Sequence, residues 1–126
     1  QASVKLSELA VGIGPFVVGP AVERKIGMSA MSQLAIDATQ WQSAHWAEKK
    51  GLYTSVHETV DEMDLAINSL IQKLAKSNPE AMYELKKIFW QGTETWDELL
   101  FERAKISGRL VLSEFTKNAI SAFKAK

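Results

Sequence analysis

The sequence contains no cysteine, which excludes disulfide bonds and thiolate metal sites. It has only two histidines, His45 and His57, so a histidine-based metal cluster would need several carboxylates to complete it. Neither histidine has a partner at a spacing typical of a metal site or a catalytic triad. We therefore predict neither a metal site nor a catalytic histidine.

The chain also lacks net charge and long apolar runs. Fifteen Lys and Arg residues balance 15 Asp and Glu residues, so no basic excess indicates a nucleic-acid partner and no acidic or basic tail is present. No apolar stretch approaches the ~18 residues of a membrane span, and no segment resembles a signal peptide. These absences favour a cytoplasmic or organelle-matrix protein without a membrane partner.

What remains is typical of one globular domain: 126 residues, 46% of them hydrophobic and 24% charged. The chain starts with Gln1 and enters a strand-like segment almost at once. A strand at Ala2 to Leu6 needs partners, and few candidates follow. We therefore expect that the chain begins in the middle of a larger one.

The first third predicts short elements. Alternation and β-branched residues favour strands at 3–6 and 52–56. Pro15 suits a first helical turn. Short helices are expected at about 17–26, starting late because of Pro20 and ending at Gly27, at 29–37, and from a Ser43 cap to 49–51.

From Thr59 onward the sequence predicts four helices with short connections. Thr59 and Glu62 form a capping box, Pro79 starts the second of these helices, and Thr95 and Ser113 can cap the third and fourth. Apolar residues at helical spacing define one face of the first helix and a buried face of the second. These residues are Val60, Met63, Ile67, Leu70, Ile71 and Leu74, then Met82, Leu85, Ile88 and Phe89. The chain as a whole is predicted to be mainly α with one or two short strands.

One carboxylate stands out. Glu8 lies among Leu6, Leu9, Val11 and Ile13, in a stretch that ends at Gly12, Gly14 and Pro15. Burying a charged group among apolar neighbours is costly, and carboxyl groups in such surroundings serve as general acids or bases. Alternation on a strand would equally allow Glu8 to point into solvent. The local residues alone leave both interpretations open.

Other candidate groups have ordinary interpretations. The glycines near Glu8 are too few and differently spaced for a nucleotide-binding loop, although glycines before a helix leave room for a ligand. The four tryptophans fit a core or interface better than stacking platforms. The lysines are expected on solvated faces, while a lysine cluster at a chain end could hold phosphates. The tryptophans are residues 41, 46, 90 and 96, and the lysines are 86, 87, 117, 124 and 126.

The order of several motifs resembles the crotonase superfamily of acyl-CoA enzymes. SELAVGIGP, from Ser7 to Pro15, is followed by KIG at Lys25 to Gly27 and by AEKKGLYTSV from Ala47. The chain then ends in helices, a phenylalanine and a basic run. The resemblance covers nearly all of the chain but only the C-terminal half of such an enzyme. Phe16, Val17 and Val18 resemble the methylglutaconyl-CoA hydratase-like branch, which serves branched-chain acyl-CoA breakdown.

This resemblance implies an α/β crotonase-like fold in the complete protein. Residues 1–58 would be the C-terminal part of the core and carry one catalytic glutamate, and residues 59–126 a helical region of the trimerisation type. Glu8 falls where the family has its second catalytic glutamate. Gly12, Pro15 and Phe16 lie where the family shapes the acyl pocket, and Lys126 near the lysine that reaches a coenzyme A phosphate.

The resemblance also implies that catalytic parts are missing. The first catalytic glutamate and the two backbone donors that hold the thioester oxygen belong to the other half, so the chain alone is expected to be inactive. No separate cofactor is expected, because coenzyme A is part of the substrate. A homo-oligomer, trimer or hexamer, is the implied assembly.

Two functions follow from the sequence. The first is an enoyl-CoA hydratase or isomerase of fatty-acid or branched-chain amino-acid breakdown, in which Glu8 exchanges a proton beside an enolate-like thioester. The second is a non-catalytic helical oligomerisation or interaction module, suggested by the apolar faces and the tryptophans.

Overall fold

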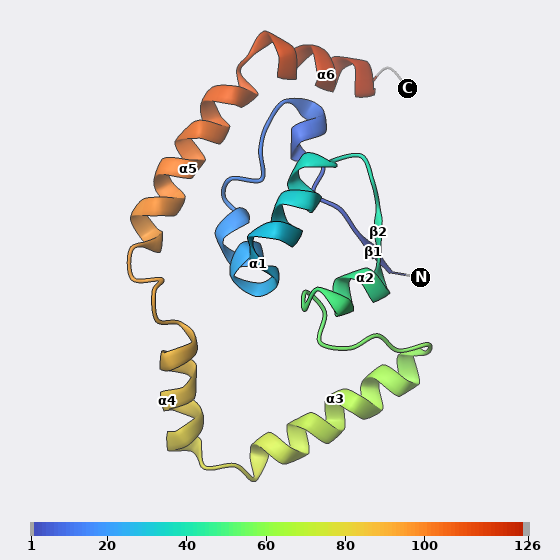
Figure 1. The fold of residues 1–126 in the computed structure, drawn as a ribbon, viewed down its shortest axis with the longest axis vertical. Helices are drawn as coiled ribbons and strands as arrows, with labels where there is room; N and C mark the ends of the chain where they lie inside the picture. Colours follow the sequence, from blue (N-terminus) through green and yellow to red (C-terminus); the bar gives the residue numbers. More distant parts are fainter. Residues whose placement is uncertain (1, 125–126) are drawn as a thin grey trace. The chain divides into compact units, whose positions relative to one another are not determined.

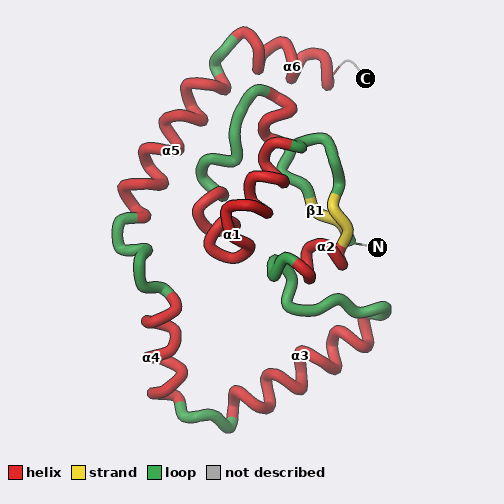
Figure 2. Tube along the Cα trace, in the orientation of Figure 1, coloured by secondary structure: helices red, strands yellow, loops and turns green. Residues whose placement is uncertain are grey.

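The structure, a computed structural model, describes residues 2–124. Its chain divides into two compact units. The first combines the residues up to Thr54 with those from Asp97 onward, and the second is Ser55–Trp96. Figure 1 shows the path of the chain and Figure 2 its secondary structure, which is mainly helical.

The first unit contains both strands and most of the buried residues. Its elements are β1 (Ser3–Val4), the 3₁₀ helix η1 (Glu8–Val11), α1 (Gly19–Ile36), β2 (Gln42–Ser43), α2 (Ala44–Lys49), α5 (Trp96–Val111, which begins at the boundary) and α6 (Glu114–Lys124). The strands pair antiparallel, Ser3 opposite Ser43 and Val4 opposite Gln42, and α2 contacts both. A small core forms from Ala30, Met31, Leu34, Ala38 and Ala47.

The predicted strand at 52–56 is wrong. Those residues form a loop, and the partner of β1 is β2 at Gln42–Ser43 instead. The amides of Leu52 and Tyr53 donate to the carbonyl oxygen of Ala47, at 2.8 and 3.2 Å. These bonds close the C-terminal end of α2 and occupy donors that a strand would need.

Helix α1 has the break that Gly27 predicts. Gly27 adopts φ 76° and ψ 161°, so two helical stretches meet there at a kink. The first stretch starts at Gly19 with Pro20 in its first turn, and the second ends at the Asp37 cap, as expected. Pro15 does not start a helix: its carbonyl accepts from the Gly19 amide at 2.9 Å, in the turn that leads into α1.

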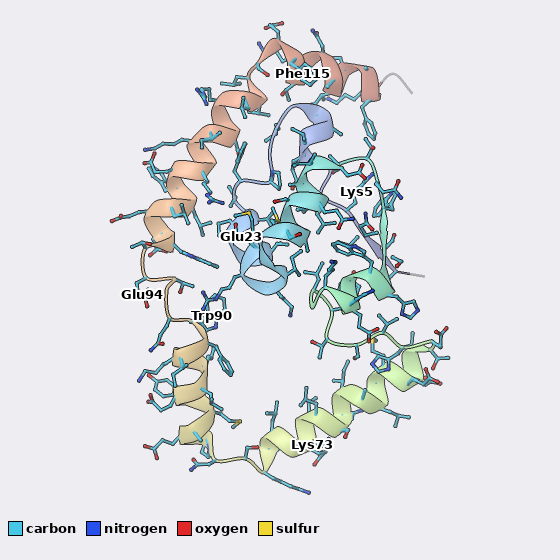
Figure 3. The ribbon with its side chains drawn as sticks, in the orientation of Figure 1. Lys5, Glu23, Lys73, Trp90, Glu94 and Phe115 are labelled. Atoms are coloured by element: carbon cyan, nitrogen blue, oxygen red, sulfur yellow. The ribbon has the colours of Figure 1, made fainter. Side chains whose placement is uncertain are left out.

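The second unit consists of α3 (Val60–Ala75) and α4 (Pro79–Phe89), connected by a short loop. The capping box at Thr59 and Glu62 is present, and the side chain of Asn78 caps α4. Within this fully described segment the two helices do not pack on each other. Figure 3 draws their side chains as sticks along both helices.

The apolar faces of these helices lie in solvent in this chain. The six residues predicted to form the face of α3 are between 40% and 67% exposed. The prediction that the face of α4 is buried is wrong for Leu85, Ile88 and Phe89, which are 49%, 55% and 64% exposed. Sequence periodicity identified both faces but not what covers them.

The predicted fold class of the chain, mainly α with short strands, is confirmed. The caps predicted at Ser43 and Ser113 are also confirmed, since each hydroxyl accepts from the amide three residues later. The division into a catalytic core at 1–58 and an oligomerisation region at 59–126 is functional and stays a prediction.

Candidate functional site

Glu8 is the first residue of η1, not part of a strand. The short helix ends at Gly12, whose φ of 82° is the left-handed conformation that glycine adopts readily. The amides of Gly12 and Ile13 donate to the carbonyl oxygens of Leu9 and Glu8, both at 3.0 Å. Glu8 therefore sits on a tightly bonded turn that fixes its backbone.

The side chain of Glu8 lies beside a pocket of about 290 Å³. Apart from Glu8, the described residues that line it are Ile13, Gly14, Pro15, Phe16, Val17, Val18 and Ser107. All but Ser107 offer only apolar side chains or glycine backbone. The pocket suits a hydrocarbon group, with one carboxylate and one hydroxyl at its wall.

One oxygen of Glu8 is buried and has no hydrogen-bond partner. Oε2 is the only buried side-chain oxygen or nitrogen found without one in residues 2–124. Most buried polar atoms in proteins are paired, because an unpaired one carries a desolvation cost. The interpretation of Glu8 as a solvent-pointing strand residue is therefore wrong for this oxygen. An unpaired acceptor beside an apolar pocket is suited to exchange a proton with a ligand.

Helix α5 contributes Ser107 to the lining of the pocket. The Nη1 of Arg103 donates to the carbonyl oxygen of Phe16 at 3.4 Å, across 87 positions of sequence. One turn further along the same helix, Ser107 reaches the pocket. Its hydroxyl donates only weakly, at 3.4 Å, to the carbonyl oxygen of Arg103 in its own helix.

The predicted acyl-pocket residues fall into different places. Pro15 and Phe16 line the pocket, whereas Gly12 ends η1 and does not line it. Lys126 lies outside the described residues. Sequence analysis missed Arg103 and Ser107. Their helical spacing with Ile106 and Leu110 marks one face of α5, but sequence spacing alone does not say which segment that face meets.

The histidines lie elsewhere. His45 Nδ1 is 3.8 Å from Glu48 Oε2, and His57 Nε2 is 2.8 Å from Ser55 Oγ. Over residues 2–124, no group of three or more His, Asp or Glu side chains could hold a metal ion. No helix in the same range is long and apolar enough to cross a membrane.

The tryptophans are not core residues in this chain. Trp41 is 56% exposed and lies under the ammonium group of Lys5, 4.4 Å from its ring centroid. Trp90 is 52% exposed and meets Trp96 edge to face at 6.1 Å, in the second unit. The alternative prediction, that the tryptophans lie at an interface, stays a prediction.

The structure of this chain is similar to that of a known protein. The crystal structure of an enoyl-CoA hydratase from Mycobacterium avium matches with a TM-score of 0.87 and 23% sequence identity. The match covers 98% of this chain and 48% of that enzyme. The chain has the fold of about half an enoyl-CoA hydratase.

No protein-family model matches the sequence, and no curated protein does. The solved structure confirms the fold that the predicted resemblance implied. Membership of the crotonase superfamily stays a prediction. The branch within that superfamily stays a prediction.

Proposed function

We propose that this chain supplies the C-terminal half of an enoyl-CoA hydratase or isomerase that acts on acyl-CoA thioesters. The observation that carries the proposal is the unpaired, buried oxygen of Glu8 beside an apolar pocket, in a chain with the fold of such an enzyme. The substrates would be intermediates of fatty-acid or branched-chain amino-acid breakdown. The methylglutaconyl-CoA hydratase-like branch is the narrower proposal.

In this proposal Glu8 is a general acid or base. It protonates or deprotonates a carbon beside the thioester carbonyl, or exchanges a proton with water. The wall formed by Pro15 and Phe16 holds the acyl chain beside the carboxylate. Gly12 contributes by ending the turn that carries Glu8. Lys126 is proposed to contact a phosphate of coenzyme A.

The chain alone is proposed to be inactive. The resemblance assigns the first catalytic glutamate of the family and the two backbone donors for the thioester oxygen to the other half of such an enzyme. Oxyanion stabilisation is usually the largest single catalytic contribution. We propose no cofactor beyond the coenzyme A of the substrate, and a cytoplasmic location for the complete protein.

Glu8→Gln in the complete protein tests the proposal. The substitution keeps the size of the side chain but removes its ability to exchange a proton, so turnover of an enoyl-CoA should fall by orders of magnitude. Circular dichroism and thermal unfolding should stay near wild type. Glu23→Gln, on α1 and outside the pocket, is the matched control and should keep full turnover. Unchanged turnover in Glu8→Gln would exclude Glu8 as the acid or base.

The exposed apolar faces of α3 and α4 support a second candidate, a non-catalytic helical oligomerisation module. A binding assay with a coenzyme A thioester separates the two. Binding by the complete protein but not by residues 59–126 favours the enzyme, whereas no binding by the complete protein favours the module. The two are compatible, because the enzyme is itself proposed to be a homo-oligomer, trimer or hexamer, that uses these helices.

A further inference from the structure

The first turn of α6 packs directly on the turn that carries Glu8. A Cβ atom placed on Gly12 would lie 2.5 Å from Cδ1 of Phe115 and 2.7 Å from Oγ1 of Thr116. Both distances are shorter than real Cβ contacts, so only a glycine fits at this position. Figure 3 labels Phe115 on this turn of α6, and α6 and η1 are among the few element pairs in contact.

Thr116 is the central residue of this contact. Its side chain is fully buried, with 0% exposure, although most threonines in proteins are exposed. Its Oγ1 accepts a hydrogen bond from the Ser113 hydroxyl at 3.2 Å, and its backbone amide donates to the same Ser113 oxygen at 3.3 Å. The N-terminal cap of α6 therefore also fixes the side chain of Thr116.

A short covalent and hydrogen-bonded path leads from Thr116 to the carboxylate. Thr116 contacts Gly12, and the amides of Gly12 and Ile13 are bonded to the carbonyl oxygens of η1, including that of Glu8. No hydrogen bond holds the Oε2 atom of Glu8 itself. The direction of this carboxylate thus depends on the position of its backbone more than on its own contacts.

We propose that Thr116 is a positioning residue for Glu8. By filling the space against Gly12, it holds the η1 turn in the position that presents the carboxylate to the pocket. The inference rests on the proposed function of Glu8 as acid or base. In this proposal α6, more than 100 positions away in the sequence, helps to position the carboxylate of Glu8 on η1.

The first test needs no activity. The chain is labelled with ¹³C at its glutamate carboxyl groups, and the Glu8 resonance is identified by its loss in Glu8→Gln. Thr116→Ala should displace the Glu8 carboxyl resonance and the Gly12 amide resonance. Thr39→Ala removes the same atoms at an exposed loop position and should leave both unchanged. If Thr116→Ala folds and displaces the Glu8 resonance no more than Thr39→Ala does, the proposal is wrong.

The second test uses turnover by the complete protein. Thr116→Ala should lower kcat ten- to a hundredfold with KM within about twofold, because misplacement of a reacting group by an ångström costs on this order. Thr116→Ser keeps the hydroxyl that accepts from Ser113 and should recover most of the lost kcat. Loss of turnover in Glu8→Gln but wild-type kcat in Thr116→Ala would overturn the positioning role alone.

The outcomes separate the two proposals. Full turnover in Glu8→Gln would overturn the proposed function, whereas a displaced Glu8 resonance in Thr116→Ala would still support the contact. If Thr116→Ala fails to fold, Thr116→Val replaces it, since valine keeps the branched shape and removes only the hydroxyl's bond to Ser113. Because valine fills the same space against Gly12, the proposal then expects a Glu8 resonance and a kcat near wild type. A displaced Glu8 resonance with a lowered kcat in Thr116→Val would contradict it.

Discussion

At the scale of single residues, the Oε2 atom of Glu8 carries a desolvation cost that no hydrogen bond from residues 2–124 offsets. This atom is buried without a hydrogen bond, among residues that are nearly all apolar. An unsatisfied buried polar atom costs about 1–3 kcal/mol. Residues retained at such a cost are typical of functional sites, where activity and stability compete.

We therefore predict that Glu8→Leu stabilises the chain. Removing the unpaired oxygen should raise the free energy of unfolding by about 1 kcal/mol, while the complete protein loses activity. Urea unfolding monitored by tryptophan fluorescence measures the change. Glu23→Leu is the control, because Glu23 lies on α1 outside the pocket and should change stability by less than about 0.5 kcal/mol. A destabilised Glu8→Leu chain would mean that the carboxylate has a stabilising partner after all.

At this scale the sequence singled out Glu8 as a candidate but did not predict whether its carboxylate is buried. The apolar neighbours of Glu8 left both burial and exposure open. The pocket beside Glu8 combines the segment after the 3₁₀ turn with Ser107 of α5, which lies about a hundred positions away. Ser107 and Arg103 could not be found from local sequence for the same reason.

At the scale of elements, two glycines with open space around them should respond in opposite ways. A Cβ atom at Gly27 or at Gly108 would meet nothing within 4 Å. Gly27 has φ 76° and ψ 161°, a region open essentially to glycine only, whereas Gly108 lies inside the regular helix α5. Packing is therefore the same at both positions, and only the backbone differs.

Gly27→Ala should lower the free energy of unfolding by about 1–3 kcal/mol, because alanine is strained at that φ and ψ. Gly108→Ala should raise it by about 0.5–1 kcal/mol, because alanine loses less backbone entropy in a helix. Thermal or urea unfolding of both variants of this chain gives the comparison. If both substitutions change the free energy of unfolding in the same direction, side-chain contacts and not backbone conformation determine the effect at one of the two sites.

Element boundaries were the most predictable part of the fold. Caps and breakers act within a few residues, so Thr59, Ser43, Gly27 and Pro79 set helix ends that local chemistry alone determines. The strand partner of β1 was not predictable in this way. Its pairing with Gln42–Ser43 depends on the path of the chain between the two strands. The predicted partner is not available, because the amides of Leu52 and Tyr53 donate to the last turn of α2.

At the scale of the whole molecule, the chain exposes large apolar side chains along α3 and α4. Leu70, Ile71 and Leu74 on α3 are 53%, 52% and 46% exposed, and α4 adds a face of its own. Contiguous apolar surface of this kind marks interaction sites or leads to association. The proposed homo-oligomer would bury such faces.

We predict that the chain self-associates through the apolar face of α3. Replacing Leu70 by Glu and Leu74 by Lys keeps helix propensity and adds a favourable i, i+4 pair, but removes the apolar face. The doubly substituted chain should sediment as a smaller species than the wild type at about 50 μM, a concentration at which an association with a dissociation constant in the micromolar range is populated. Light scattering should likewise give a lower mass for the doubly substituted chain than for the wild type.

Asn68→Glu with Gln72→Lys introduces the same charges at the same spacing on α3 and is the matched control. This variant should keep the association state of the wild type. A wild-type chain that is monomeric and compact at every concentration would contradict both this prediction and the oligomerisation module.

The sequence by itself determined the helix ends, the kink, the apolar faces and the choice of Glu8, because each depends on residues close together in the chain. It also carried the resemblance to an enoyl-CoA hydratase fold, through the order of several short motifs. Only the tertiary structure decided that the Oε2 atom of Glu8 is buried and unpaired, that Ser107 of α5 lines its pocket and that α6 packs on Gly12. These features depend on contacts between segments about a hundred positions apart, which local periodicity and capping do not encode.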